Sequence, residues 1–285
     1  MRAGLVTHSH PENSAEGVRA AIAAAERAGA ELLAPADEFE KHGDVAEGLV
    51  RVDKLPERLD VCIVLGGDGS ILYALRTYGR TGVPVFGINF GTIGFLAAAE
   101  RDQLEDGLKR AFAGDYEVMN LPALELGSDP SAPLAFNDVS FTRKPHGRVA
   151  ELSYTVAGEE VGNVRCDGLV AATPAGSTGY NLANAGPILA WGVEGYVVSF
   201  IAPHTLTARA LVVAPTDVLR VRNMAGRDPV DVALDGEPSS ELQPGEEIEI
   251  GFVDDVGLLA HLPGASFYSR LRERFGRLAQ WPPSS

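Results

Sequence analysis

Residues 65–70 (LGGDGS) place one acidic side chain within a run of glycines, between a segment that predicts a strand and a segment that predicts a helix. Glycines can adopt backbone angles that are closed to other residues, and they allow close approach to a ligand. The N-terminus of the following helix would offer free N–H groups and a positive dipole end to a phosphate. Asp68 does not fit a simple phosphate loop, because its carboxylate repels phosphate. It could hold a metal that bridges the phosphates, accept a proton from an attacking hydroxyl, or only shape the turn or cap the helix.

Two common nucleotide-binding motifs do not occur in the sequence. A GxxxxGK segment followed by Ser or Thr is missing, which argues against a Walker-type NTPase. The GxGxxG fingerprint of hydride-transfer enzymes is not evident either. A dinucleotide that binds to this chain would therefore be bound in another way.

Several segments together resemble one enzyme family. GGDG is similar to a loop that phosphofructokinases, diacylglycerol-type lipid kinases and NAD kinases share, so it does not choose between them. Residues 167–189 (DGLVAATPAGSTGYNLANAGPIL) closely resemble the long NAD kinase signature, DGL-x-x-STPTGSTAY. The segments 137–139 (NDV), 202–206 (APHTL) and 234–237 (LDGE) resemble other parts of that family, in family order. The resemblance implies transfer of a phosphoryl group from ATP, or another donor, to the adenosine ribose 2′-hydroxyl of NAD. It also implies a divalent cation, Mg2+, whose ligands the sequence leaves unknown.

The resemblance carries roles over to matching residues. Asp68 would accept the proton of the 2′-hydroxyl, with Gly67 and Gly69 beside the substrate. The residues expected to bind NAD are Phe95, Asn137, Asp138, Arg148, Arg165, Asp167, Thr178, Gly179, Tyr180, Asn181, Ala202, Asp235 and Glu237. Some positions depart from the family's usual residues: Asp138, Ala175, Gly179 and Glu237 stand where many relatives carry Glu, Thr, Ala and Gln.

Some of these residues also have a purely structural interpretation. Asn137 and Asp138 would hold the dinucleotide, yet an Asn-Asp pair also favours a turn. Phe95 would pack on the adenine and Tyr180 would stack on a base, yet both could be core aromatics. Arg148 and Arg165 would suit a pyrophosphate, yet lone arginines on strands are commonly surface residues. Asp167 would contact the nicotinamide amide.

The elements that must position these residues change in character along the chain. Apolar segments at 3–7, 30–34, 60–65 and 83–88 predict strands, and the continuous apolar run at 60–65 is typical of a parallel strand covered on both faces. They alternate with helical patterns: one begins at Asn13 with Glu16 as a capping partner and ends at Gly29, one follows GGDGS, and one covers 101–113. Residues 35–56 are weakly patterned and are expected to form a loop with short helix. This alternation predicts an open, mostly parallel α/β sheet.

After about residue 115 the segments become short, β-rich and separated by Pro, Gly, Asn and Asp, which predicts an antiparallel, sandwich-like β-domain. The tail, residues 265–281, turns helical again and aligns Phe267, Leu271, Phe275 and Leu278 on one face. We expect this helix to return to the first domain. The predicted domains are residues 1–115, which would bind the phosphate donor and include 258–285, and residues 116–257, which would bind NAD.

Composition limits the partners of the chain. The formal net charge of −15 over 285 residues argues against a nucleic-acid surface and against an acidic membrane. No apolar run reaches membrane-spanning length and the first residues lack a signal-peptide core, so a cytoplasmic protein is the default expectation. The family tends to assemble, so the resemblance implies a homodimer or homotetramer.

Two other functions remain as alternatives. A diacylglycerol-type lipid kinase would share GGDG, but the segment TPAGSTGY (173–180) and the lack of a basic amphipathic membrane face argue against it. A non-catalytic dinucleotide sensor would keep the binding segments and lose the base, whereas Asp68 is present.

Overall fold

The computed structural model describes residues 1–91, 94–129, 131–264 and 266–276, and the chain forms two compact units. The N-terminal unit comprises Met1–Met119 and the described part of Leu258–Ser285. The C-terminal unit comprises Asn120–Gly257. Strand β18 (Glu247–His261) passes from the second unit into the first. None of the helices in the described ranges is both long and apolar enough to cross a membrane.

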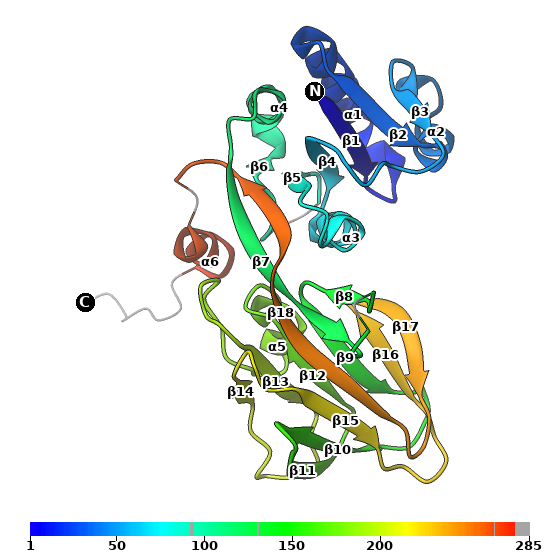
Figure 1. Cartoon of the computed structure of the whole chain (residues 1–285), viewed down its shortest axis with the longest axis vertical. Helices are drawn as coiled ribbons and strands as arrows, with labels where there is room; N and C mark the ends of the chain where they lie inside the picture. The colour runs from blue at the N-terminus through cyan, green and yellow to red at the C-terminus, as the bar shows by residue number, and fades with distance from the viewer. Residues whose placement is uncertain (92–93, 130, 265, 277–285) are drawn as a thin grey trace, which may run out of the picture. The chain divides into compact units, whose positions relative to one another are not determined.

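The N-terminal unit contains a parallel sheet with the strand order β3-β2-β1-β4-β5, followed by the end of β18 (Figure 1). Its strands are β1 (Arg2–Thr7), β2 (Glu31–Pro35), β3 (Val50–Val52), β4 (Val61–Gly66), β5 (Pro84–Asn89) and β6 (Ala99–Glu100). Every residue of β4 is buried, as a strand covered on both faces requires. The sheet confirms the predicted α/β class, while β3 lies in the stretch 35–56 that was expected to be loop and short helix.

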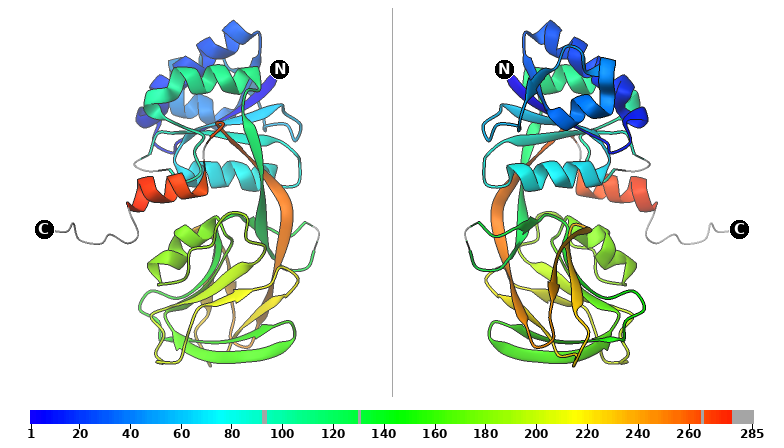
Figure 2. Two further views of the ribbon diagram at one scale, coloured as in Figure 1. Left: turned by 90° about the vertical axis from the view of Figure 1, so that its left-hand side faces the viewer. Right: turned by 90° about the vertical axis from the view of Figure 1, so that its right-hand side faces the viewer.

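Helices cover both faces of this sheet. They are α1 (Pro11–Ala28), α2 (Ala36–His42), η1 (Gly43–Ala46), α3 (Asp68–Tyr78), η2 (Arg101–Gln103), α4 (Leu104–Ala113) and α6 (Phe267–Phe275). Figure 2 shows α1 and α4 on one face and α3 and α6 on the other. The predicted start of the first helix at Asn13 is wrong, because α1 begins at Pro11 with His10 as its N-cap. Proline suits the first position of a helix, where its missing N–H has no intrahelical partner.

The strand order reverses at β1, which has β2 on one side and β4 on the other. Thr7 at the end of β1 pairs with Leu65 near the end of β4. The loops after these two strands therefore start side by side at the carboxyl edge of the sheet. In open α/β sheets ligands bind at this kind of edge.

The C-terminal unit is built from two antiparallel sheets, as predicted. One runs β11-β10-β15-β18 and the other β14-β13-β12-β9-β16-β17. Phe141, Tyr196, Val221 and Ile250 are fully buried in the core of this unit. The elements not yet named are β7 (Glu117–Leu126), β8 (Leu134–Ala135), β9 (Asp138–Arg143), β10 (Ala150–Val156), β11 (Glu159–Cys166), β12 (Gly168–Ala172), η3 (Gly176–Thr178), α5 (Tyr180–Ala183), β13 (Tyr196–Ile201), β14 (Leu211–Val213), β15 (Leu219–Asn223), β16 (Val230–Leu234) and β17 (Glu237–Leu242).

The C-terminal helix α6 packs within the N-terminal unit. The ring of Phe267 meets the ring of Phe95 edge-on, with 5.9 Å between centroids, and Leu271 is also buried. The helix ends at Phe275, whose side chain is partly exposed, and residues 277–281 of the predicted tail helix lie outside the described residues. Leu278 lies outside the described residues.

Candidate active site

The GGDG loop connects β4 to α3 at the carboxyl edge of the parallel sheet. Gly66, Gly67 and Gly69 do not have positive φ angles, so the prediction that they adopt backbone angles closed to other residues is wrong. Position 66 requires glycine because there is no room for a side chain: a Cβ there would lie 2.5 Å from the Ser70 hydroxyl oxygen. Gly67 is the N-cap of α3 and faces Gly91 across the site. Gly69 has open space around its Cα, which leaves the surface beside Asp68 uncovered by protein.

Asp68 is the first residue of α3, but its carboxylate does not cap that helix. Instead, both carboxylate oxygens accept the backbone N–H of Phe95 at 2.9 Å, and Oδ1 also accepts the N–H of Leu96 at 3.1 Å. The side chain of Asp68 is 25% exposed, and Nη1 of Arg274 lies 3.7 Å from its Oδ2. The carboxylate is therefore held in one orientation and remains reachable from outside.

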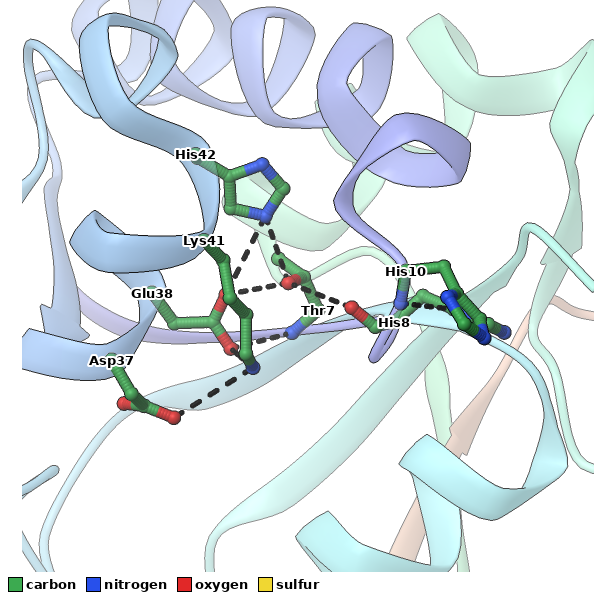
Figure 3. A network of polar contacts seen from close by, with 7 residues as sticks. All are labelled: Thr7, His8, His10, Asp37, Glu38, Lys41 and His42. Carbon is green, nitrogen blue, oxygen red and sulfur yellow. Dashed lines mark hydrogen bonds and ion pairs between the residues drawn. The ribbon is translucent and has the colours of Figure 1, made fainter.

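A buried polar network fixes the neighbouring loop after β1 (Figure 3). The carboxylate of Glu38 accepts the N–H and hydroxyl of Thr7 and pairs with Lys41, while Nε2 of His42 lies 2.9 Å from the Thr7 hydroxyl. Burial lowers the pKa of His42, with Glu38 raising it and Lys41 lowering it further. Just beyond, the N–H of His8 donates to the Leu65 carbonyl at 2.9 Å. The network thus ties the end of β1 to the strand that leads into GGDG.

Phe95 lies deep in the N-terminal unit rather than on its surface. Its side chain is 3% exposed and packs on Phe267. This position supports the core-aromatic interpretation over packing on an adenine. Its backbone N–H, which contacts Asp68, is what brings it to the site.

In the C-terminal unit, Asp235 organises the segment that carries Asn137 and Asp138. Asp235 has φ of 52°, and its carboxylate accepts the N–H groups of Phe136, Asn137 and Asp138 at 3.2, 2.6 and 3.2 Å. Its own N–H donates to the Asp138 carbonyl at 2.8 Å. A carboxylate occupied in this way shapes the site and has little capacity left for a ligand.

The side chains of Asn137 and Asp138 remain available for polar partners. The Oδ1 atom of Asn137 is buried and has no hydrogen-bond partner among the described residues. Asp138 is 6% exposed. Burial, and secondarily the charge of Asp235, raises the pKa of Asp138 to about 7. A buried acceptor and a readily protonated carboxyl are groups that a polar ligand could satisfy.

The segment 173–181 wraps onto this turn. Thr173 donates its hydroxyl to the Phe136 carbonyl at 2.6 Å and its N–H to the Asn137 carbonyl at 2.9 Å. A Cβ on Gly176 would lie 1.9 Å from the Asn137 carbonyl oxygen, so only glycine fits there. The signature segment and the Asn137–Asp138 pair are therefore one packed structure.

Within this segment, the side chain of Tyr180 reaches the surface, with 40% exposure. Burial raises the pKa of Tyr180, and the charges of Asp138 and Asp167 raise it further. Thr178 donates its hydroxyl to the Ala175 carbonyl, and Asn181 is fully buried and bonds to the carbonyls of Ser177 and Pro187. The side chains of Thr178 and Asn181 thus stabilise the segment itself. Gly179 is exposed.

The arginine that meets Asp167 is Arg143, which the sequence did not single out. Its Nε lies 2.6 Å from Asp167 Oδ1. Arg148 is exposed, and Arg165 pairs with Glu151 at 3.0 Å. The remaining predicted residues, Ala202 and Glu237, are also exposed, and Ala202 has φ of 43°. Sequence inspection also did not identify Arg270 and Arg274 of α6, which lie around the Asp68 loop.

Comparison with known proteins identifies a single family. Sequence models of the ATP-NAD kinase N-terminal and C-terminal domains match residues 20–116 and 136–253. An NAD kinase of Gemmatimonas aurantiaca is 36% identical over 225 residues, which cover 76% of this chain and 78% of that protein. The crystal structure of an NAD kinase from Archaeoglobus fulgidus in complex with ATP is similar with a TM-score of 0.71 and 27% identity, covering 97% of this chain and 98% of that one. Yeast NADH kinase complexed with NADH shares the fold, with a TM-score of 0.85, 20% identity, and coverage of 100% and 90%.

Proposed function

Since this chain belongs to the ATP-NAD kinase family and phosphorylates NAD, we propose that Asp68 accepts the proton of the adenosine ribose 2′-hydroxyl during the transfer. The observation that carries the proposal is the orientation of the Asp68 carboxylate by the N–H groups of Phe95 and Leu96. Phosphoryl transfer passes through a loose transition state, so alignment of the hydroxyl contributes as much as the base itself. An oriented, partly exposed carboxylate at the N-terminus of α3 serves both needs.

The C-terminal unit would bind NAD and the N-terminal unit the phosphate donor. We assign direct NAD contacts to four side chains: Asn137, whose Oδ1 has no partner among the described residues, Asp138, whose pKa is raised to about 7, the partly exposed Asp167, and the exposed Tyr180. Carboxylates accept hydrogen bonds from ribose hydroxyls or amino groups, and an amide both donates and accepts. Glycine at 179 leaves the backbone beside Tyr180 open to a ligand. Arg148, Arg165, Ala202 and Glu237 would lie at the rim, whereas Thr178, Asn181 and Asp235 would act by shaping the site.

ATP is the phosphoryl donor that we propose, together with a divalent cation such as Mg2+. The relative from Archaeoglobus fulgidus, which is similar over nearly the whole chain, is described in complex with ATP. No group of three or more His, Cys, Asp or Glu in the described ranges could hold a metal ion. The triphosphate and water would therefore supply most of the ligands of the cation, as is usual for Mg2+ at phosphates.

We further propose that the protein works in the cytoplasm as a homodimer or homotetramer. Large apolar side chains lie exposed on the C-terminal unit, among them Leu206 at 93% and Val212 at 49%. Exposed apolar groups of this size are suited to a subunit contact. Sedimentation of the purified protein at several concentrations measures the assembly directly, and a monomer at all of them would contradict it.

The purified protein, incubated with NAD, ATP and Mg2+, should form NADP, which an NADP-specific dehydrogenase detects. Asp68→Asn should lower kcat by a factor on the order of 10² to 10⁴ while the protein stays folded. Asp106→Asn, an exposed aspartate of α4, is the matched control and should behave as wild type. Full activity of Asp68→Asn would contradict the assignment of the base.

Parallel assays separate the alternative functions and define the donor. A lipid kinase would phosphorylate diacylglycerol and leave NAD unchanged, and a sensor would bind NAD without turnover. Replacing ATP by other nucleoside triphosphates or polyphosphate, and NAD by NADH, defines the preferred donor and acceptor.

A further inference from the structure

Helix α6 places the guanidinium of Arg270 on residues 95–97, the loop whose N–H groups orient Asp68. Nη1 of Arg270 donates to the carbonyl oxygen of Phe95 at 2.8 Å and to that of Ala97 at 2.6 Å. The Arg270 side chain is mostly buried, and α6 is anchored beside this loop by the contact between Phe267 and Phe95. A buried guanidinium that bonds to two carbonyls fixes the path of the chain between them.

The same loop donates to Asp68 from its other side. In the peptide group that joins Phe95 to Leu96, the carbonyl accepts from Nη1 of Arg270 at 2.8 Å. The N–H of the same group donates to Oδ1 of Asp68 at 3.1 Å. A carbonyl that accepts from a cation polarises its peptide group and strengthens the N–H as a donor. One peptide group thus connects the guanidinium to the carboxylate.

We propose that Arg270 is a positioning residue for the reaction, which sets the orientation of Asp68 through the Phe95–Leu96 peptide group. The inference rests on the proposed role of Asp68 as proton acceptor. Arg270 bonds to the carbonyl groups of Phe95 and Ala97, and we assign it no contact with the substrate, so its effect passes through Asp68.

Two further observations fit this arrangement. Arg274, one turn after Arg270 on α6, lies 3.7 Å from Asp68 Oδ2 and has its guanidinium 6.0 Å from the centre of the Phe95 ring. Burial lowers the pKa of Arg270, and the negative charge of Asp68 is the largest of the effects that oppose this. The face of α6 that meets the loop is therefore electrostatically coupled to the carboxylate.

The test compares Arg270→Met, Arg270→Lys and Arg272→Met in steady-state kinetics. Arg270→Met should lower kcat by about 10- to 100-fold, with the KM values for NAD and ATP changed less than about threefold. Lysine can still donate to carbonyls, so Arg270→Lys should recover a large part of kcat. Arg272 is an exposed arginine on the same helix, and Arg272→Met should match wild type in kcat and in melting temperature.

A double-mutant cycle distinguishes an effect through Asp68 from a general loss of structure. In an Asp68→Ala background, adding Arg270→Met should leave the residual rate almost unchanged, because the group it positions is gone. An equal fractional loss in both backgrounds, or a wild-type kcat for Arg270→Met, overturns the inference. If Arg270→Met does not fold, Arg270→Lys carries the test through the same cycle, and equal losses again overturn it. Retained activity in Asp68→Ala alone would instead contradict the proposed base.

Discussion

The carboxylate of Asp235 accepts a 2.6 Å hydrogen bond from the backbone N–H of Asn137, which lies 98 residues earlier in the chain. The adjacent N–H groups of Phe136 and Asp138 donate to the same carboxylate. The resemblance made Asp235 a residue that binds the dinucleotide. Its geometry indicates that it holds the Asn137–Asp138 pair in place and affects NAD binding indirectly.

Asp235→Asn should therefore weaken NAD binding more than it slows turnover. Asparagine tolerates the positive φ at this position, so the substitution mainly removes the charge and one acceptor. With at least one of the three N–H groups left without an acceptor, the free energy of unfolding should fall by about 1–3 kcal/mol. The KM for NAD should rise about tenfold, equivalent to 1.4 kcal/mol, with kcat much less affected.

The exposed neighbour Glu237 supplies the control for this substitution. Glu237→Gln changes only the charge of an exposed side chain and should leave the free energy of unfolding near that of wild type. Urea unfolding and NAD titrations of both variants make the comparison. A stable Asp235→Asn with unchanged KM would show that the turn does not depend on the carboxylate.

Asp138 should make NAD binding depend on pH. Its pKa is raised to about 7, first by burial and then by the charge of Asp235. Below pH 7 the carboxyl is mostly protonated and is a weaker acceptor for ribose hydroxyls or an amino group. Above pH 7 it is a carboxylate and accepts them well. The KM for NAD should therefore fall as pH rises from 6 to 8, while Asp138→Asn should show a higher KM with little change over this range. The same pH dependence in the variant would assign the titration to another group.

The elements were largely predictable where the sequence pattern reflects burial. β4 is apolar throughout because both of its faces are covered, and α1 ends at Gly29 because the left-handed φ of 61° there suits glycine. β3 was not predicted, since only three residues form it and two of them are exposed, which leaves no apolar pattern to detect. The Asn13 cap failed because Pro11 provides a competing helix start.

The site was less predictable, because its contacts join distant parts of the chain. Arg143 meets Asp167 because β9 pairs with β12 in a register that sets Thr142 opposite Gly168. Nothing in the local sequence favours Arg143 over Arg148. The bonds of Arg270 to Phe95 and Ala97 span about 175 residues and depend on where α6 packs. The motifs mark the segments that form the candidate site, whereas the groups that position their side chains follow from how distant parts of the chain pack.

Gly176→Ala should destabilise the C-terminal unit. A Cβ at this position would lie 1.9 Å from the Asn137 carbonyl oxygen, and backbone atoms cannot move aside as a flexible side chain can. We expect a loss of about 1–3 kcal/mol or more in the free energy of unfolding, with a higher KM for NAD because Asn137 is displaced. Gly192→Ala is the control, because no atom lies within 4 Å of its added Cβ. Similar urea midpoints for the two variants would mean that the signature segment is not packed on Asn137.

The buried network beneath the end of β1 should reduce stability in acid. The His42 side chain is fully buried, and its pKa is lowered first by burial, with Glu38 opposing and Lys41 adding to the effect. Below about pH 6.5 the unfolded chain takes up a proton at His42 that the folded chain resists, so the free energy of unfolding falls as pH falls. His42→Gln keeps a partner for the Thr7 hydroxyl but does not titrate. Its stability should decline less than that of wild type between pH 7 and 5, in urea titrations at each pH.

His204→Gln, at an exposed position, is the control and should lose stability with falling pH as wild type does. If the free energy of unfolding falls with pH equally in wild type and His42→Gln, protonation of the His42 imidazole does not cause the loss of stability in acid.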